Sequence, residues 1–244
     1  FNTIAIWCSN EKCDAIYPQS ADFTFYGGLY RGAHLICVPE THFELLHYGD
    51  LGIHAATEPA SWDKEDFMLH IRTKICGVEK DNQVIYQIFD EDGKEVASAA
   101  RPADSPDTSI PLYKPHRWDI KNSYQYTLKA LIMRNNECLD EVELKFGVRT
   151  FCCDPGRGFL INGNCVPLRG VSRHQDKLYQ GNALTKEDHI RDAELIEEIG
   201  ANTVRLAHYQ HAQEFYNECD KRGFVVWAEI PFISVMNEDP LAHE

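Results

Sequence analysis

Polar side chains able to bind a sugar or an anion follow three apolar segments in the second half of the chain. Arg173 and His174 come directly after the first segment, Arg205 and His208 lie at the end of the second, and Glu229 lies at the end of the third. Guanidinium and imidazole groups donate hydrogen bonds to hydroxyl and carboxylate oxygens, and a carboxylate accepts them. This set of groups therefore favours a pocket for a polyhydroxylated or anionic ligand.

These groups can form one site only if the apolar segments are neighbouring parallel strands. The sequence predicts strands at about 167–171, 202–207 and 224–230, separated by helices that begin near 185 and near 212, and the first of these strands is expected to be buried. Strands and helices that alternate in this way form βαβ units with a parallel sheet. The carboxyl ends of parallel strands lie on one rim, where a β/α barrel places its active site. We therefore expect the three polar clusters to converge.

Both predicted helices carry boundary signals. Thr185 and Asp188 form a capping box at the start of the first helix, and Gly200 ends it. The second helix ends at Gly223. The face of the first helix that packs against the sheet is expected to comprise Ile190, Ala193, Ile196 or Glu197, and Ile199.

Residues 34–150 are strand-like throughout. Short segments with period-two patterning are expected to form strands at 33–38, 67–75, 83–89, 95–100, 124–133 and 140–148. Asp92-Gly93 and Asn135-Asn136 predict tight hairpin turns, and the proline-rich stretch 101–115 is expected to connect strands rather than form a central one. This pattern predicts an antiparallel sandwich of immunoglobulin-like size, with Trp118 in its core.

The first 33 residues fit neither pattern. They contain strand-forming aromatic residues and a Gly27-Gly28 pair, and they lack both an initiator methionine and the features of a signal peptide. We interpret them as the last strands of a β-domain whose earlier part is missing.

Composition excludes several classes of partner. The chain has 244 residues, a formal net charge of −14 and no long basic block, so neither nucleic acid nor an anionic membrane surface is an expected partner. No apolar segment approaches the roughly 20 residues needed to span a bilayer. The nine cysteines include no CxxC pair. They predict reduced, mostly buried thiols in a cytosolic protein, with a disulfide framework as the alternative, and one buried side chain in the adjacent pair Cys152-Cys153.

Each candidate residue also has a purely structural interpretation. His208 and His211 form an HxxH pair, but without a third ligand a loop histidine with satisfied hydrogen bonds is the better interpretation. Arg205 could simply pair with Glu229 inside a barrel. Recurrence of polar groups at three successive strand ends nevertheless favours a site.

Three motifs resemble a known family. RGVSRHQD, GANTVRLAHYQ and GFVVWAEIPF, in this order and spacing, resemble the opening strands of the catalytic barrel of glycoside hydrolase family 2, most closely its bacterial β-galactosidases. ADFTFYGGLYR resembles the end of the family's sugar-binding jelly-roll domain. The resemblance covers the whole chain. It implies the C-terminal part of a jelly roll at 1–38, an immunoglobulin-like β-sandwich at 39–150 and the N-terminal part of a TIM (β/α)8 barrel at 151–244.

The resemblance also assigns roles to the candidate residues. His174 and His208 correspond to histidines that contact the sugar, Arg205 to an arginine that supports the catalytic carboxylates, and Glu229 to a supporting acidic position. Asp22 corresponds to a residue that reaches from the jelly roll to the substrate. Arg169 corresponds to an arginine in the barrel core, for which a structural role is expected.

Metal sites of the family are only partly retained. Some members hold a sodium ion beside the residue that corresponds to Asp22, so sodium is possible there. A magnesium site after the third strand is doubtful, because Ile233 and Val235 stand where ligands would be needed. No cofactor is required for the reaction that the resemblance implies.

The resemblance implies a retaining glycosidase acting on terminal non-reducing β-galactosides in carbohydrate metabolism. Retaining glycosidases use two carboxyl groups, and the family places both after later barrel strands, so the chain is expected to be an inactive middle fragment. Asn237-Glu238 follows the third strand too soon to be the acid/base pair. Alternatives are a β-glucuronidase or β-mannosidase of the same family, or a catalytically dead carbohydrate-binding scaffold. A cytoplasmic location and a homo-oligomer are further expectations.

Overall fold

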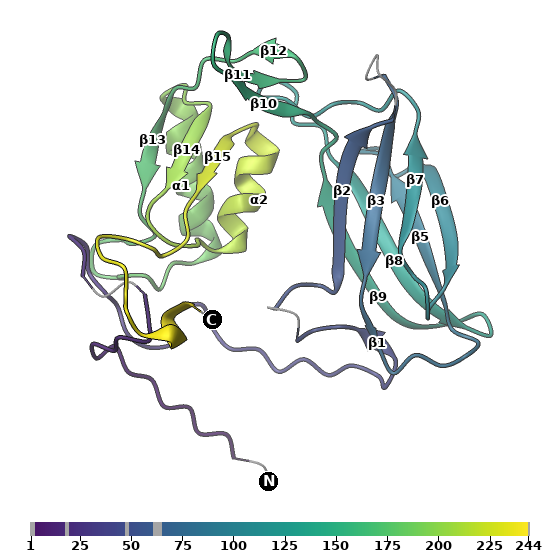
Figure 1. Cartoon of the computed structure of the whole chain (residues 1–244), viewed down its shortest axis with the longest axis horizontal. Coiled ribbons are helices and arrows are strands. Elements are labelled where there is room, and N and C mark those ends of the chain that lie inside the picture. The colour runs from purple at the N-terminus through teal and green to yellow at the C-terminus, as the bar shows by residue number, and fades with distance from the viewer. Residues whose placement is uncertain (1–2, 18–19, 47–48, 61–64, 244) are drawn as a thin grey trace. The chain divides into compact units, whose positions relative to one another are not determined.

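A computed structural model describes residues 3–17, 20–46, 49–60 and 65–243. It divides the chain into two compact units, which are described separately below (Figure 1). Unit 1 consists of Phe1–Leu35 together with Leu168–Glu244, and unit 2 consists of Ile36–Pro167. The predicted division into three domains remains a prediction.

Unit 2 is an antiparallel β-sandwich with a small sheet after it. One sheet has the strand order β6-β5-β8-β9, the other has the order β2-β3-β7, and β1 pairs with β4. The small sheet has the order β10-β11-β12. The strands of this unit are β1 (His42–Phe43), β2 (Ile53–Pro59), β3 (Phe67–Thr73), β4 (Ile75–Cys76), β5 (Gln83–Phe89), β6 (Glu95–Pro102), β7 (Thr108–Leu112), β8 (Tyr126–Arg134), β9 (Glu137–Phe146), β10 (Phe151–Asp154), β11 (Gly158–Ile161) and β12 (Asn164–Cys165).

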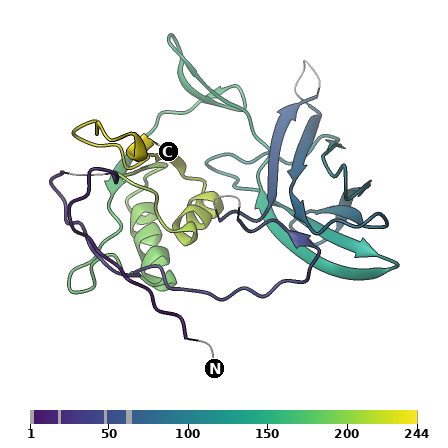
Figure 2. The ribbon, with the colours of Figure 1, turned by 60° about the horizontal axis from the view of Figure 1, so that its bottom comes forward.

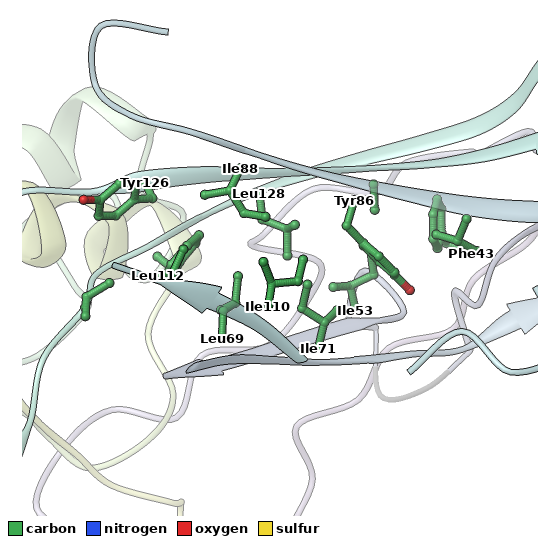
Figure 3. Packing of buried hydrophobic residues seen from close by; sticks show 14 of the residues in the cluster. Phe43, Ile53, Leu69, Ile71, Tyr86, Ile88, Ile110, Leu112, Tyr126 and Leu128 are labelled. Carbon is green, nitrogen blue, oxygen red and sulfur yellow. The ribbon is translucent and has the colours of Figure 1, made fainter. Parts of the chain in front are cut away.

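Side-chain alternation builds the core between the two larger sheets. Every second residue of β3 and β8 is buried, and these side chains meet those of β5 and β7 in one hydrophobic cluster (Figure 3). Tyr86 on β5 is fully buried in this cluster. Its hydroxyl group bonds the hydroxyl of Thr73 at 2.7 Å and donates to the carbonyl of Pro106 at 2.9 Å. Burial raises the pKa of the Tyr86 phenol to about 12, so the group stays neutral.

Replacing Tyr86 with phenylalanine is expected to lower the free energy of unfolding by about 1–3 kcal/mol. The substitution leaves the buried Thr73 hydroxyl and the partly buried Pro106 carbonyl without the phenol as a partner. Chemical denaturation of the two proteins measures the difference. Tyr113→Phe is the matched control, because the side chain of Tyr113 is exposed and its hydroxyl can bond water. Equal losses in both variants would contradict the prediction.

Several expectations for this unit are confirmed. Asp92-Gly93 joins β5 to β6, Asn135-Asn136 joins β8 to β9, and Trp118 is buried. Residues 33–38 were expected to form a strand, but they form no regular secondary structure and are exposed. The weakly patterned β2 was not predicted.

The proline-rich stretch 101–115 was expected only to connect strands. Part of it instead forms the strand β7. β7 lies at the edge of its sheet and pairs only with β3, so Pro111 removes no hydrogen bond from a central strand.

Unit 1 contains a parallel sheet and the helices that connect its strands. The sheet has the order β13-β14-β15 and both strand pairs are parallel. Its elements are β13 (Gly170–Arg173), α1 (Lys186–Glu198), β14 (Thr203–Leu206), α2 (Gln213–Arg222), β15 (Val225–Ala228) and the 3-10 helix η1 (Pro240–His243). The helices α1 and α2 lie side by side and share one apolar cluster with β14 (Figure 1, Figure 2). The predicted βαβ arrangement is therefore confirmed.

The helix boundaries are confirmed, whereas the predicted buried face of α1 is partly wrong. The Thr185–Asp188 capping box is present, and α2 ends at Gly223 with a positive φ of 72°. On α1, His189, Ala193 and Ile196 are the buried residues, and Ile199 is 67% exposed. His189 is buried because its ring bonds another buried side chain, a contact that hydrophobic periodicity does not reveal.

The first strand of the sheet was expected to be buried and is not. The first three residues of β13 are exposed, because β13 lies at one edge of the sheet. The sheet can form at all because residue 170 is glycine. A Cβ atom there would lie 1.9 Å from the backbone carbonyl oxygen of Thr203, so any other residue would force β13 away from β14. Trp227 on β15, at the opposite edge, is 67% exposed.

The N-terminal segment contains no strand within residues 3–17 and 20–41, contrary to the expectation of terminal jelly-roll strands. It is instead held by side-chain contacts to the end of the chain. The Tyr17 hydroxyl accepts a hydrogen bond from the backbone of Asn237 at 2.5 Å, and the Asn237 side chain donates to the carbonyl of Asp14 at 2.8 Å. Asn237 therefore has a structural role, as expected for a loop residue.

The prediction that most cysteines are buried is wrong. All nine lie within the described residues, and only Cys219 is buried. Cys152 and Cys153 are both exposed, because β10 belongs to the small sheet rather than to the sandwich core.

Candidate active site

The end of β14 and the end of β15 meet in a hydrogen-bonded cluster. Arg205 Nε donates to Glu229 Oε1 at 2.6 Å, and Arg205 Nη2 lies 3.1 Å from Glu229 Oε2. His208 joins this pair through Nδ1, which lies 3.1 Å from Glu229 Oε2 and 2.9 Å from Arg205 Nη2. Parallel pairing of β14 with β15 sets Arg205 opposite Trp227, two residues before Glu229. The predicted convergence of these two strand ends is thus present.

Glu229 is held as a carboxylate. Burial alone would raise its pKa, but the hydrogen bonds from Arg205 and His208 lower the pKa below the usual value. A carboxylate that is ionised and already bound to an arginine is poorly suited to donate a proton. It is well suited to fix the two side chains that it contacts.

The ring of His208 is oriented by this cluster. Nδ1 can donate to Glu229 or accept from Arg205, and in either case this edge of the ring faces the cluster. A ligand would therefore meet the opposite, Nε2 edge. Because that edge can donate or accept a hydrogen bond, it suits a sugar hydroxyl group.

His174 and Phe23 complete an aromatic wall beside His208. The ring centroids of His174 and His208 are 5.1 Å apart, and Phe23 lies 5.3 Å from His174 and 5.6 Å from His208. Phe23 comes from the N-terminal segment, which therefore reaches the strand ends of the sheet. Tyr209 lies 5.7 Å from Phe23 and extends this wall. Phe23 and Tyr209 were not predicted as site residues, although both lie in motifs quoted above, because an aromatic residue gives no local sign of where its ring packs.

The other predicted residues lie outside this cluster. Asp22 is exposed and adjoins Phe23 in the sequence, so it lies near the wall without a described bond to it. Arg169 is exposed rather than in a core. Arg173 was grouped with the strand-end residues, but its side chain is buried on the helix side of the sheet. Alternation along β13 explains this, since consecutive residues such as Arg173 and His174 point to opposite faces.

A cleft adjoins the aromatic wall within unit 1. It encloses about 530 Å³, which is within the size range of small-molecule sites. Its aromatic lining comprises Tyr17, Phe23, Phe25, Tyr26, Tyr30 and Tyr209. Flat aromatic faces next to paired imidazoles form a surface on which a sugar ring can stack.

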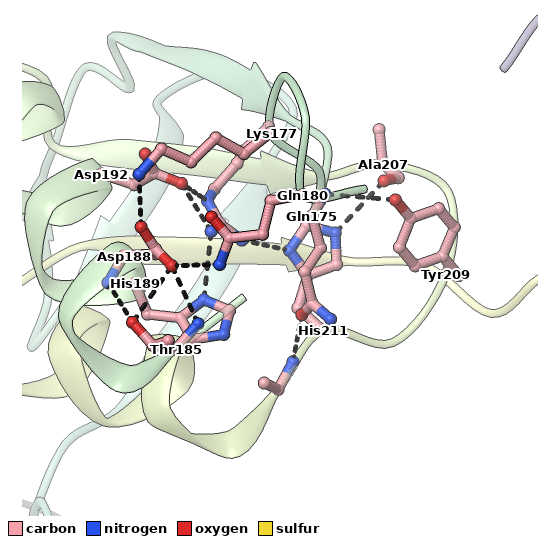
Figure 4. Close-up of polar contacts among 12 residues, drawn as sticks. Gln175, Lys177, Gln180, Thr185, Asp188, His189, Asp192, Ala207, Tyr209 and His211 are labelled. Carbon is pink, nitrogen blue, oxygen red and sulfur yellow. Dashed lines mark hydrogen bonds and ion pairs between the residues drawn. The ribbon is translucent and has the colours of Figure 1, made fainter. Parts of the chain in front are cut away.

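The loop between β13 and α1 is fixed at several points. Asp188 at the start of α1 accepts hydrogen bonds from the side chain of Gln180 at 2.8 Å and from the backbone of Thr185 at 2.9 Å, and it pairs with Lys177 (Figure 4). These bonds hold the pKa of Asp188 well below its usual value, the Lys177 bond contributing most. The Gln175 backbone donates to the Tyr209 hydroxyl at 3.1 Å. The loop is thus fixed at the start of α1 and at Tyr209.

His211 has the structural role expected for a loop histidine, and its burial predicts a pH dependence of stability. Burial lowers the pKa of His211 to about 4 from 6.5, and the charge of Arg173 acts in the same direction. The pKa of His189 is also lowered by burial.

Among the described residues, no group of three or more His, Cys, Asp or Glu side chains could hold a metal ion.

The free energy of unfolding is expected to fall as pH drops from about 7 to about 4. In this interval the unfolded chain protonates His211 and the folded chain does not, so protons favour the unfolded state. The loss from His211 alone is at most about 3 kcal/mol. Thermal denaturation between pH 7.5 and pH 4.5 measures it, and His211→Gln should give a shallower dependence than the parent. Identical slopes would show that His211 does not titrate in this way.

Comparison with known proteins places this geometry in a family. The model described as "Glycosyl hydrolases family 2, TIM barrel domain" matches residues 155–243, and the model described as "Glycosyl hydrolases family 2" matches residues 58–149. A β-glucuronidase from Bacteroides fragilis is 33% identical over 95% of this chain and 34% of its own length. A β-galactosidase from Thermoanaerobacter pseudethanolicus is 28% identical over 94% of this chain and 31% of its own length.

A solved structure is also similar over nearly the whole chain. The crystal structure of an FMN-binding β-glucuronidase from Facaelibacterium prausnitzii L2-6 has a TM-score of 0.93 and 51% sequence identity, covering 96% of this chain and 36% of that one. The chain thus spans about a third of the length of these relatives. Since the two family models together account for the sandwich and for the start of the barrel, the chain belongs to glycoside hydrolase family 2.

Proposed function

We propose that this chain supplies one wall of the sugar site of a retaining glycoside hydrolase, and that its substrates are terminal β-glucuronides. The observation that carries the proposal is the cluster in which Arg205 and Glu229 orient His208 beside His174. Paired imidazole edges next to aromatic rings suit the hydroxyl groups and the apolar face of a pyranose ring. The whole protein would be about three times as long as the chain, by comparison with its relatives.

The preference for glucuronides departs from the motif-based expectation of galactosides. It is supported by the names of the relatives, because the 51% identical structure and the 33% identical sequence are both β-glucuronidases. Arg205 is not the expected partner of a substrate carboxylate, since its Nε and Nη2 atoms are already engaged by Glu229. The cations that would bind the glucuronide carboxylate are therefore expected in the remaining part of the whole protein.

A β-galactosidase is the second candidate. The amino-acid sequences around His174 and His208 favour a β-galactosidase, and β-galactosidases also occur among the relatives. A β-mannosidase or a catalytically dead scaffold is the weaker alternative, because a scaffold would not need the Arg205, His208 and Glu229 cluster in addition to an aromatic wall.

Retaining hydrolysis requires two carboxyl groups about 5 Å apart, one as nucleophile and one as acid/base. Glu229 is bound to Arg205 and serves neither role in this proposal. Both reacting carboxylates are therefore placed in the remaining part of the whole protein, and the chain alone is proposed to be inactive. Hydrolysis involves no net oxidation or reduction, so the reaction needs no redox cofactor.

The metal sites that we propose depend on which side chains can serve as metal ligands. A sodium ion beside Asp22 is compatible with the exposed carboxylate of that residue, and oxygen atoms of substrate and solvent would complete the coordination of the ion. A magnesium site after β15 is not proposed, because Ile233 and Val235 offer no side-chain ligands.

The substrate is the proposed binding partner of the whole protein. A homo-oligomer and a cytoplasmic location remain predictions. None of the helices in the described ranges is long and apolar enough to cross a membrane.

Hydrolysis of chromogenic substrates tests the proposal. The whole protein is assayed with the 4-nitrophenyl β-glucuronide, β-galactoside and β-mannoside, and kcat/KM is compared. The glucuronide is expected to be preferred by at least about 100-fold, since a site built for a charged group rejects analogues that lack it. Preference for the galactoside would favour the second candidate. No turnover of any substrate by a folded protein would overturn the glycosidase proposal.

A further inference from the structure

The residue before His208 is held from two sides. The backbone N–H of Ala207 donates to the carbonyl of Arg173 at 3.0 Å, and the carbonyl of Ala207 lies 3.2 Å from His211 Nε2. Ala207 is itself buried. The position from which the His208 side chain extends is thus set by Arg173 and His211, neither of which lies in the aromatic wall.

The chemistry of these contacts fixes the state of His211. A carbonyl oxygen only accepts, so Nε2 of His211 must carry the proton that it donates to Ala207. Nδ1 then has a free lone pair, and it accepts from Arg173 Nη1 at 3.0 Å. The ring is therefore the neutral Nε2–H tautomer, with both nitrogens used. Burial lowers its pKa to about 4, which keeps it neutral at physiological pH.

Arg173 is fixed as firmly as His211. Its Nε and Nη2 atoms donate to Asp192 Oδ2 at 2.9 and 2.6 Å, and Nη2 lies 3.1 Å from His189 Nδ1. The guanidinium carbon lies 4.0 Å from the centroid of the Phe215 ring, so an aromatic face covers it. Only 5% of the Arg173 side chain is exposed. Because the Arg173 guanidinium is buried and bonded to Asp192, it can hold His211 in one orientation.

A continuous series of hydrogen bonds therefore runs from α1 to the residue before His208. It passes from Asp192 through Arg173 and His211 to the carbonyl of Ala207, and Figure 4 shows Asp192, His211 and Ala207 within this network. On the far side of His208, Nδ1 meets the Arg205–Glu229 pair. His208 is thus fixed by its side chain at one end and by its backbone at the other.

We propose that His211 is a positioning residue, which sets the place of the sugar-binding His208 through the carbonyl of Ala207. The inference rests on the proposed function, because it assigns His211 a part in the same site. A displacement of a site residue by about 1 Å can reduce catalysis about 100-fold. His211 therefore affects the reaction without touching the substrate.

Three variants of the whole protein separate positioning from simple packing. His211→Asn retains an acceptor near the place of Nδ1 but cannot reach Ala207, whereas His211→Gln can extend an N–H donor to it. His189→Asn is the matched control, because His189 is also buried and also accepts from Arg173 but makes no described bond to Ala207. Melting temperature, kcat and KM are measured for each variant with the 4-nitrophenyl glycoside that the parent hydrolyses.

His211→Asn is expected to lower kcat about 10- to 100-fold with a smaller change in KM. His211→Gln should restore much of that loss, and His189→Asn should lower the melting temperature without lowering kcat. In the His208→Ala background, His211→Asn should have little further effect, since the residue through which it acts is gone.

Two results overturn the inference. One is an unchanged kcat in a folded His211→Asn variant, and the other is a loss of the same size with and without His208. If the parent itself hydrolyses no glycoside, the proposed function fails first. In that case, a crystal structure of His211→Asn with His208 in its original place would refute the positioning role independently.

Discussion

Replacing His208 with alanine is expected to lower kcat/KM for the preferred glycoside by about 100- to 1,000-fold. The Arg205–Glu229 pair holds one edge of the ring, so the free Nε2 edge is oriented toward a ligand before binding. A donor placed in advance is worth more in the transition state than one that must reorganise. Steady-state kinetics of the two whole proteins measures the loss.

A surface histidine provides the control for this prediction. His54 in the sandwich pairs with Asp50 near solvent, and His54→Ala should leave kcat/KM unchanged. Circular dichroism and the melting temperature show whether both variants fold. A folded His208→Ala protein with full activity would remove His208 from the site.

The largest loss of stability is expected from replacing Arg173 with methionine. This change removes the cation that bonds Asp192, His189 and His211 together, and it leaves buried acceptors without a donor. Breaking a buried ion pair on one side typically costs about 3–5 kcal/mol, and the partial exposure of Asp192 places this case near about 3 kcal/mol. The free energy of unfolding from urea denaturation measures the effect.

Arg191→Met is the matched control for this substitution. Arg191 pairs with Glu194 on the exposed surface of α1, with more than half of its side chain exposed, so its loss should cost less than about 1 kcal/mol. Equal effects at positions 173 and 191 would mean that the Arg173 network adds no stability beyond a surface pair.

Local signals in the sequence were enough to predict the two helices of unit 1 and the parallel sheet that they connect. The Thr185–Asp188 capping box and Gly223 mark helix ends through bonds between residues close in sequence, so they are readable without the fold. Parallel pairing then follows from alternation of strands with helices, and it brings Arg205, His208 and Glu229 together as predicted.

Contacts between distant segments could not be predicted in the same way. Phe23 packs on His174 although about 150 residues separate them, and no periodicity links the two. Arg173 and His174 are neighbours of similar polarity, and the sequence does not say which of them faces the helices. In the sandwich, β7 was missed because Pro111 argues against a strand unless the strand is known to lie at an edge.

The most direct test of the account is a crystal structure of the whole protein with a glucuronic-acid-derived lactone, which resembles the flattened sugar ring of the transition state. The account predicts the ring beside Phe23, with hydroxyl groups within hydrogen-bond distance of His174, His208 and Asp22. A lactone bound in a pocket that contains none of these residues would contradict the assignment of the site.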